Sequence, residues 1–68
     1  MIKRSFSIAG HRTSVALEAE FWAALEAEAR KEHRSLAALI GRIDGTRASR
    51  NLASALRLHV LSRALMTH

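Results

Sequence analysis

The chain of 68 residues contains no cysteine and no proline, and 11 Lys and Arg residues outweigh 6 Asp and Glu residues to give a net charge of +5. A domain of this size buries only about 60% of the surface that its unfolded chain exposes, and without cysteine neither disulfides nor zinc–thiolate sites can add stability. The length therefore argues against an enclosed catalytic cleft, and the hydrophobic content of 49% favours association with a second copy of the chain.

Polar and apolar side chains alternate near the amino end, which is typical of extended strands. The apolar positions are even-numbered up to Ile8 and odd-numbered from Val15 on, so one regular strand cannot place both sets on the same face. Gly10 lies where the pattern changes, and glycine in a strand pattern often marks a bulge or bend. We therefore predict a short extended arm over residues 3–8 and one firm strand over residues 11–17.

Three helices are predicted after the strand. Ala, Glu and Leu dominate residues 18–31, and apolar side chains recur there at four-residue spacing. A second helix begins after Ser35, a good N-cap, because apolar residues follow at i, i+3, i+4 and i+7 spacing. Residues 44–50 have the composition of a loop, and a third helix is predicted to begin with Asn51 as its N-cap and to run to about Met66. Its apolar residues point in nearly all directions, which indicates that a partner chain covers it.

One strand cannot be stable alone, because its backbone groups need a ladder partner. A chain with one firm strand is therefore expected to pair it with the same strand of a second copy, which gives a two-stranded antiparallel ribbon about a twofold axis. Val15 and Leu17 would face the helices, and Arg12, Ser14 and Ala16 would be exposed on a ribbon that fits a B-DNA major groove. The residues predicted for the core and the dimer contact are Val15, Leu17, Phe21, Trp22, Leu25, Leu36, Leu39, Ile40, Ile43, Leu56 and Val60.

Enzyme and membrane signatures are lacking in the sequence. The four histidines have no metal-ligand spacing, and neither a Gly-x-Ser-x-Gly elbow nor a glycine-rich phosphate loop occurs. We expect a protein that is not an enzyme, with no catalytic residue, cofactor or metal. Charged and polar residues interrupt every long apolar stretch, so no membrane segment is expected. The lack of cysteine fits a reducing compartment, and the expected location is the cytoplasm.

The positive charge lies on both sides of an acidic middle segment. Residues 18–32 carry five glutamates, whereas the segment from Arg34 onward contains six arginines and a single acidic residue, Asp44. An excess of arginine suggests a polyanionic partner, because the guanidinium group pairs with phosphate through two N–H groups. Net charge alone is weak evidence, since many small domains are basic.

Two motifs resemble those of a known family. The first reads RSFSIAGHRTSV over residues 4–15, and the second reads NLASALR over residues 51–57. With the order strand, helix, Ser-capped turn, helix, they resemble the ribbon-helix-helix DNA-binding proteins, and more narrowly a small bacterial subgroup of them. The resemblance implies a mainly α fold with one β-strand per chain, in an intertwined homodimer with a two-stranded antiparallel ribbon. Residues 1–10 would be a basic N-terminal arm, residues 11–44 the ribbon-helix-helix core, and residues 45–68 a loop and C-terminal helix that complete the dimer.

The resemblance also implies binding of double-stranded operator DNA, usually as a repressor or autoregulator, and hence a location on the nucleoid. Arg12, Ser14 and Ala16 would contact base edges in the major groove. Free backbone donors at the start of the second helix and the basic amino end would contact phosphates. The residues expected at phosphates are Lys3, Arg4, His11, Arg34 and Ser35.

Each of these expectations has a plainer alternative. Arg12 and Ser14 would also suit a solvated strand face, and Lys3 and Arg4 would suit a frayed basic end. The alternative function is a protein-interaction module, an antitoxin-type dimer whose apolar third helix holds a toxin-like partner. A membrane-surface peptide is disfavoured by the acidic middle helix.

Overall fold

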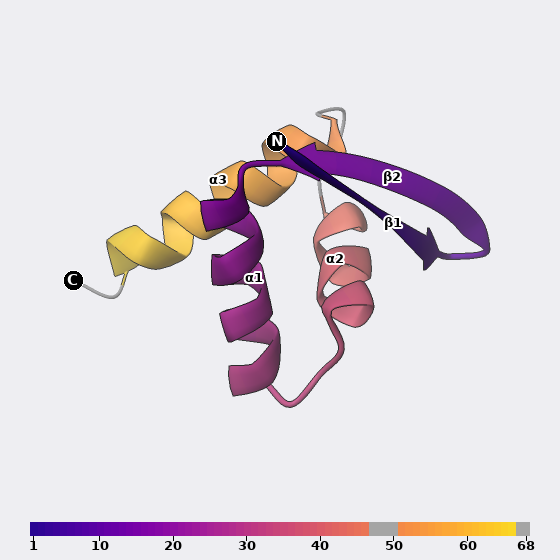
Figure 1. Ribbon diagram of the computed structural model, residues 1–68. Coiled ribbons are helices and arrows are strands. Elements are labelled where there is room, and N and C mark those ends of the chain that lie inside the picture. The colour runs from indigo at the N-terminus through magenta and orange to yellow at the C-terminus, as the bar shows by residue number, and fades with distance from the viewer. Residues whose placement is uncertain (47–50, 67–68) are drawn as a thin grey trace.

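The computed structural model describes residues 1–46 and 51–66. Within these residues the elements in chain order are β1 (Ile2–Ile8), β2 (His11–Leu17), α1 (Ala19–Lys31), α2 (Leu36–Asp44) and α3 (Leu52–Met66). Figure 1 shows the two strands over the end of the helix pair where α1 begins and α2 ends, with the α1–α2 loop at the opposite end and α3 running across α1. None of the described helices is long and apolar enough to cross a membrane.

The two strands form an antiparallel hairpin within the chain. Ile8 faces His11 across a two-residue turn of Ala9 and Gly10, whose φ angles are 52° and 82°. Positive φ at both central residues is the feature of the type I′ turn, which matches the twist of a hairpin. The expectation of one strand per chain is therefore wrong. Residues 3–8 are not a separate arm, because their backbone groups pair with β2 and give it its first ladder partner.

The hairpin explains why the alternation of apolar residues changes parity. Across a two-residue turn an even-numbered residue of one strand always faces an odd-numbered residue of the other, as Phe6 faces Thr13. The even positions of β1 and the odd positions of β2 therefore share one face of the ribbon. The change of parity at Gly10 is the consequence of a hairpin rather than of a bulge or bend in one strand.

The three helices lie close to their predicted positions, and local capping fixes where two of them begin. The Ser35 hydroxyl accepts a hydrogen bond from the Ala38 amide at 3.1 Å before α2. The Asn51 side chain accepts one from the Ser54 amide at 2.8 Å before α3. Both predicted N-caps are confirmed, and each satisfies a backbone donor that the helix itself leaves unpaired. Residues 47–50, which belong to the predicted loop, lie outside the described residues.

The core lies where the inner face of the ribbon meets the three helices. Its buried side chains are Ile8, Val15, Leu17, Trp22, Leu25, Ala29, Leu39, Ile40, Ile43, Leu52, Ala55 and Leu56. Three further residues predicted for the core pack against it while partly buried, and they are Phe21, Leu36 and Val60. These residues meet within one chain, and their contact with a second copy stays a prediction. Ile8 joins the core because β1 is a strand of the ribbon and not a free arm.

Candidate nucleic-acid interface

One face of the hairpin turns away from the helices and carries only short polar, cationic and small side chains. Alternation along the two strands brings together six residues that we call the outer ribbon face: Lys3, Ser5, Ser7, Arg12, Ser14 and Ala16. They form cross-strand pairs, and all except the half-buried Ala16 are exposed. The Ser5 and Ser14 hydroxyl oxygens lie 2.9 Å apart in one of these pairs. The outer ribbon face thus offers cations and hydroxyl groups and no carboxylate.

The opposite face of β1 is fixed to α1 around Trp22. The indole nitrogen of Trp22 donates a hydrogen bond to the Ile2 carbonyl at 2.8 Å, and its ring lies 5.8 Å from the ring of Phe6. The Arg4 guanidinium lies over the Trp22 ring at 5.1 Å and pairs with Glu26 at 3.1 Å. The structure therefore places Arg4, which the sequence predicts at a phosphate, on the helix side of the ribbon and away from Arg12.

Ion pairs with glutamates engage most of the arginines that the structure describes. The arginines that pair in this way are Arg4, Arg34, Arg42, Arg57 and Arg63. Among the residues that the structure describes, the Lys and Arg side chains without an ion pair are Lys3, Arg12, Arg30 and Lys31. The first two lie on the outer ribbon face, and the last two lie at the end of α1. The unpaired positive charge of the described residues is therefore concentrated in these two places.

The remaining predicted phosphate contacts lie in two different places. His11 is exposed at the start of β2, next to Arg12 in the strand. Arg34 and Ser35 lie in the α1–α2 loop, at the end of the helix pair opposite the ribbon (Figure 1). Since α1 has 13 residues, it separates this loop from the base of the ribbon by about 20 Å. The structure thus brings His11 to the ribbon and leaves Arg34 and Ser35 as a second, separate region.

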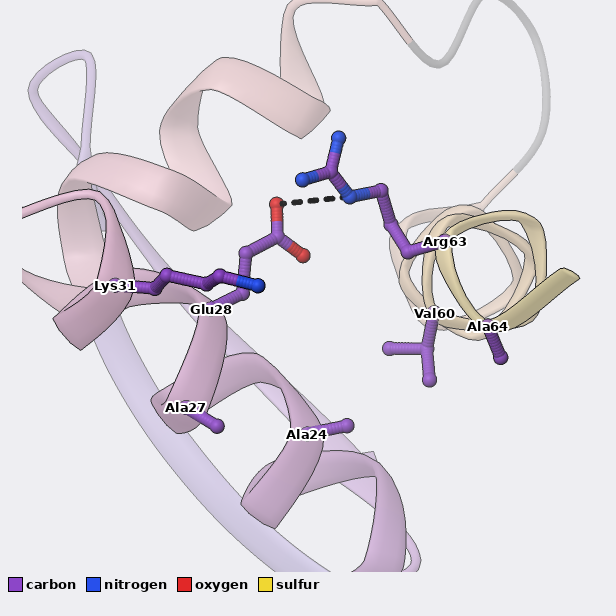
Figure 2. A pocket seen from close by; sticks show the side chains of 7 residues that line it. All are labelled: Ala24, Ala27, Glu28, Lys31, Val60, Arg63 and Ala64. Carbon is purple, nitrogen blue, oxygen red and sulfur yellow. Dashed lines mark ion pairs between the residues drawn. The ribbon is translucent and has the colours of Figure 1, made fainter. Parts of the chain in front are cut away.

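A groove of about 360 Å³ lies between α1 and α3 (Figure 2). It is lined by Ala24, Ala27, Glu28, Lys31, Val60, Arg63 and Ala64. The Glu28 carboxylate is already engaged, because His59 lies 2.8 Å from it and Arg63 lies 3.9 Å from it. No group of His, Asp and Glu in the described part of the chain could hold a metal ion. The groove is thus an ion-paired seam between helices, without the converging nucleophile, base and oxyanion donors of a catalytic centre.

The fold and the outer ribbon face together define a class of protein, in which helices carry an antiparallel ribbon of the width that a B-DNA major groove admits. The model of the ribbon-helix-helix domain matches residues 1–64, and the chain belongs to this family. Ribbon-helix-helix proteins bind DNA, act as dimers and are regulatory modules rather than enzymes. No curated protein and no solved structure matches the chain. The family that the two sequence motifs resemble is thereby confirmed.

Ser5 and Ser7 are not among the residues that the sequence predicts at DNA. The signal that places them there is their alternation with Phe6, which joins the inner face with the other even-numbered residues of β1. Once the two strands are aligned as a hairpin, Ser5 faces Ser14 and Ser7 faces Arg12. Both serines therefore belong to the same surface as the predicted base-contacting residues.

Proposed function

We propose that the protein is a homodimeric, sequence-specific DNA-binding protein that places a β-ribbon in the major groove and acts as a transcriptional repressor or autoregulator. Its proposed location is the bacterial cytoplasm, on the nucleoid. The observation that carries the proposal is the outer ribbon face, where Arg12 is exposed and makes no ion pair with any residue in 1–46 or 51–66, and where hydroxyl groups but no carboxylate lie beside it. A polyanion with acceptors in a groove is the ligand that fits this chemistry.

The proposed dimer uses the edge of β2 that does not face β1. Within residues 1–46 and 51–66 the sheet has two strands, so this edge has no ladder partner. Every second residue of β2 directs its N–H and C=O groups toward the edge. An unpaired edge of this kind is a template for a strand of another chain, and a twofold axis would join it to the same edge of a second copy. The helices of the two copies would then be intertwined around a shared core.

The proposed readout uses the side chains of β2 that lie on the outer ribbon face. Arg12 would donate two hydrogen bonds to the O6 and N7 acceptors of guanine, a contact worth about 1–3 kcal/mol of discrimination. Ser14 and Ala16 would lie at neighbouring base edges. Arg34 and Ser35 would contact phosphates at a separate position along the duplex, through the free backbone donors at the start of α2. Arg34 is exposed although it pairs with Glu32. Arg4 is left out of this proposal because it lies on the helix side of the ribbon, over the Trp22 ring and paired with Glu26.

Selection of bound sequences from a random pool of DNA duplexes tests the proposal. The wild-type protein is expected to enrich a symmetric site, with an affinity that falls linearly with salt on a logarithmic scale. Arg12→Ala should abolish the enrichment. The control Arg30→Ala removes one positive charge from an exposed position on α1, and this variant should still enrich the same site. The proposal would be overturned if wild type and Arg12→Ala bound all duplexes equally weakly at low salt.

A second candidate function is a protein-interaction module of the antitoxin type, and the outer stripe of α3 favours it. Leu58, Leu61 and Leu65 lie at i, i+3 and i+7 spacing and are 45%, 51% and 77% exposed. An apolar segment of a toxin-like partner would cover this stripe. Purification after nuclease digestion in high salt distinguishes the two functions, because a partner bound through leucines stays and one bound through nucleic acid is lost. Leu61→Ser should release the partner while DNA binding is retained.

A further inference from the structure

We infer that β1 is the outer strand of a four-stranded sheet and contacts the DNA phosphates on either side of the major groove, while β2 alone lies in the groove. This inference rests on the proposed function, since it requires the dimer to form through the free edge of β2. It assigns a binding role to the outer side chains of a strand, and its ligand is the phosphate backbone of duplex DNA.

The width of the sheet carries the argument. Each chain already pairs β1 with β2, so joining two β2 edges gives the strand order β1-β2-β2-β1. Neighbouring strands lie about 4.8 Å apart, which separates the axes of the two outer strands by about 14 Å. The major groove is about 12 Å wide and admits two strands. The inner pair of β2 strands therefore fills the groove, and the outer strands are left at its walls, where the phosphates lie.

The outer side chains of β1 suit contacts with phosphate. Lys3, Ser5 and Ser7 are exposed on the same side of the ribbon as Arg12. Lys3 makes no ion pair within the described residues, so its ammonium group is available to an anion. Serine hydroxyls are short donors that commonly contact phosphate oxygens. The two serines are too short to span two base acceptors, and the Lys3 ammonium is a compact point charge without the planar fork through which Arg12 would donate two hydrogen bonds to a base.

The inner side of β1 keeps the strand in place during binding. The Trp22 indole holds the Ile2 carbonyl at 2.8 Å, and Arg4 bridges the same ring to Glu26. Ile8, at the turn end of the strand, is buried in the core. With both ends fixed to the helices, β1 is not displaced when the ribbon meets DNA. Arg4 is thus a positioning residue that holds β1 at the groove wall rather than a DNA contact.

The test separates phosphate contact from base readout on one set of duplexes. The wild-type protein, Lys3→Ala, Arg12→Ala and the control Arg30→Ala are titrated with the selected duplex and with duplexes that carry single base-pair changes, at several salt concentrations. Lys3→Ala is expected to weaken binding by the same factor on every duplex. It should also lower the salt slope by about 2 per dimer, at 0.9 per phosphate and one phosphate per chain. Arg12→Ala should instead flatten the preference among duplexes.

The outcomes distinguish this inference from the function on which it rests. If the wild-type protein has no preferred duplex, the proposed function fails. If the wild type has a preference and Lys3→Ala changes which bases are preferred, β1 lies in the groove and the inference is overturned. An unchanged salt slope also overturns it. Lys3 is exposed and unpaired within the described residues, so thermal unfolding of Lys3→Ala should match that of the wild type and exclude misfolding.

Discussion

The turn of the hairpin gives a direct test of the pairing between β1 and β2. Ala9 has a φ of 52°, in the left-handed region, where a residue with a Cβ pays roughly 1–2 kcal/mol. Asparagine tolerates this region much better, and Asn-Gly is the preferred pair in type I′ turns. Ala9→Asn is therefore expected to raise the free energy of unfolding by about 1 kcal/mol. For a domain of 60–100 residues this raises Tm by roughly 4–8 °C.

Thermal unfolding followed by circular dichroism measures the effect, at one fixed protein concentration because association makes Tm depend on concentration. Ala9→Val is the matched variant of opposite sign, since a β-branched residue is a severe outlier at positive φ. Ala9 is exposed, so neither side chain has to fit into the core. If Asn left Tm unchanged and Val did not lower it, the two strands would not be joined by this turn, and the in-chain hairpin would be refuted.

Two other positions yield predictions of stability. His33 also has a positive φ, 56°, at the end of α1, where helices commonly place glycine, so His33→Gly should stabilise the fold by about 0.5–1 kcal/mol in the same unfolding assay. The pKa of Glu18 is lowered from its ordinary value of 4.5. The main cause is a hydrogen bond from the backbone amide of Glu18 to its carboxylate, and the next is the hydrogen bonding from Arg57. The folded state therefore binds this proton less tightly than the unfolded state, and the stabilisation present above about pH 4.5 is lost as the pH falls through the lower folded pKa. As the pH falls below about 4.5, the Tm of Glu18→Gln should therefore fall less steeply than the Tm of the wild type.

The sequence predicts well what depends on neighbouring residues. The helices follow from a periodicity of three to four residues, and the caps at Ser35 and Asn51 follow from a side chain that reaches three residues ahead. The hairpin is equally local, since Ile8 and His11 are three positions apart. Its signal, the change of parity, is present in the sequence, but a bulge or bend and a hairpin both produce it. The pairing of backbone groups distinguishes them, and alternation alone does not report that pairing.

Arg4 shows what sequence alternation can predict about a side chain and what it cannot. Its even number groups it with Phe6 and Ile8, so alternation already assigns it to the inner face of the ribbon. Its positive charge suggests phosphate instead, and only the structure shows that Glu26 and Trp22 meet it there. These partners are 22 and 18 positions away in the chain. Contacts across such separations depend on how α1 packs under β1, which no local pattern encodes.

The ion pairs also change the meaning of the net charge. Exposed ion pairs typically contribute about 0–1 kcal/mol each to stability. The glutamates of α1 therefore add little to the free energy of unfolding. Their larger effect is on the distribution of charge: the glutamates of α1, with Glu32 just after it, pair with arginines from β1, α2 and α3. Lys3 and Arg12 keep their full charge on one face of the ribbon. An evenly basic surface attracts a polyanion in any orientation, whereas unpaired charge gathered at a few places, the outer ribbon face among them, favours orientations that bring DNA to the strand that would read it.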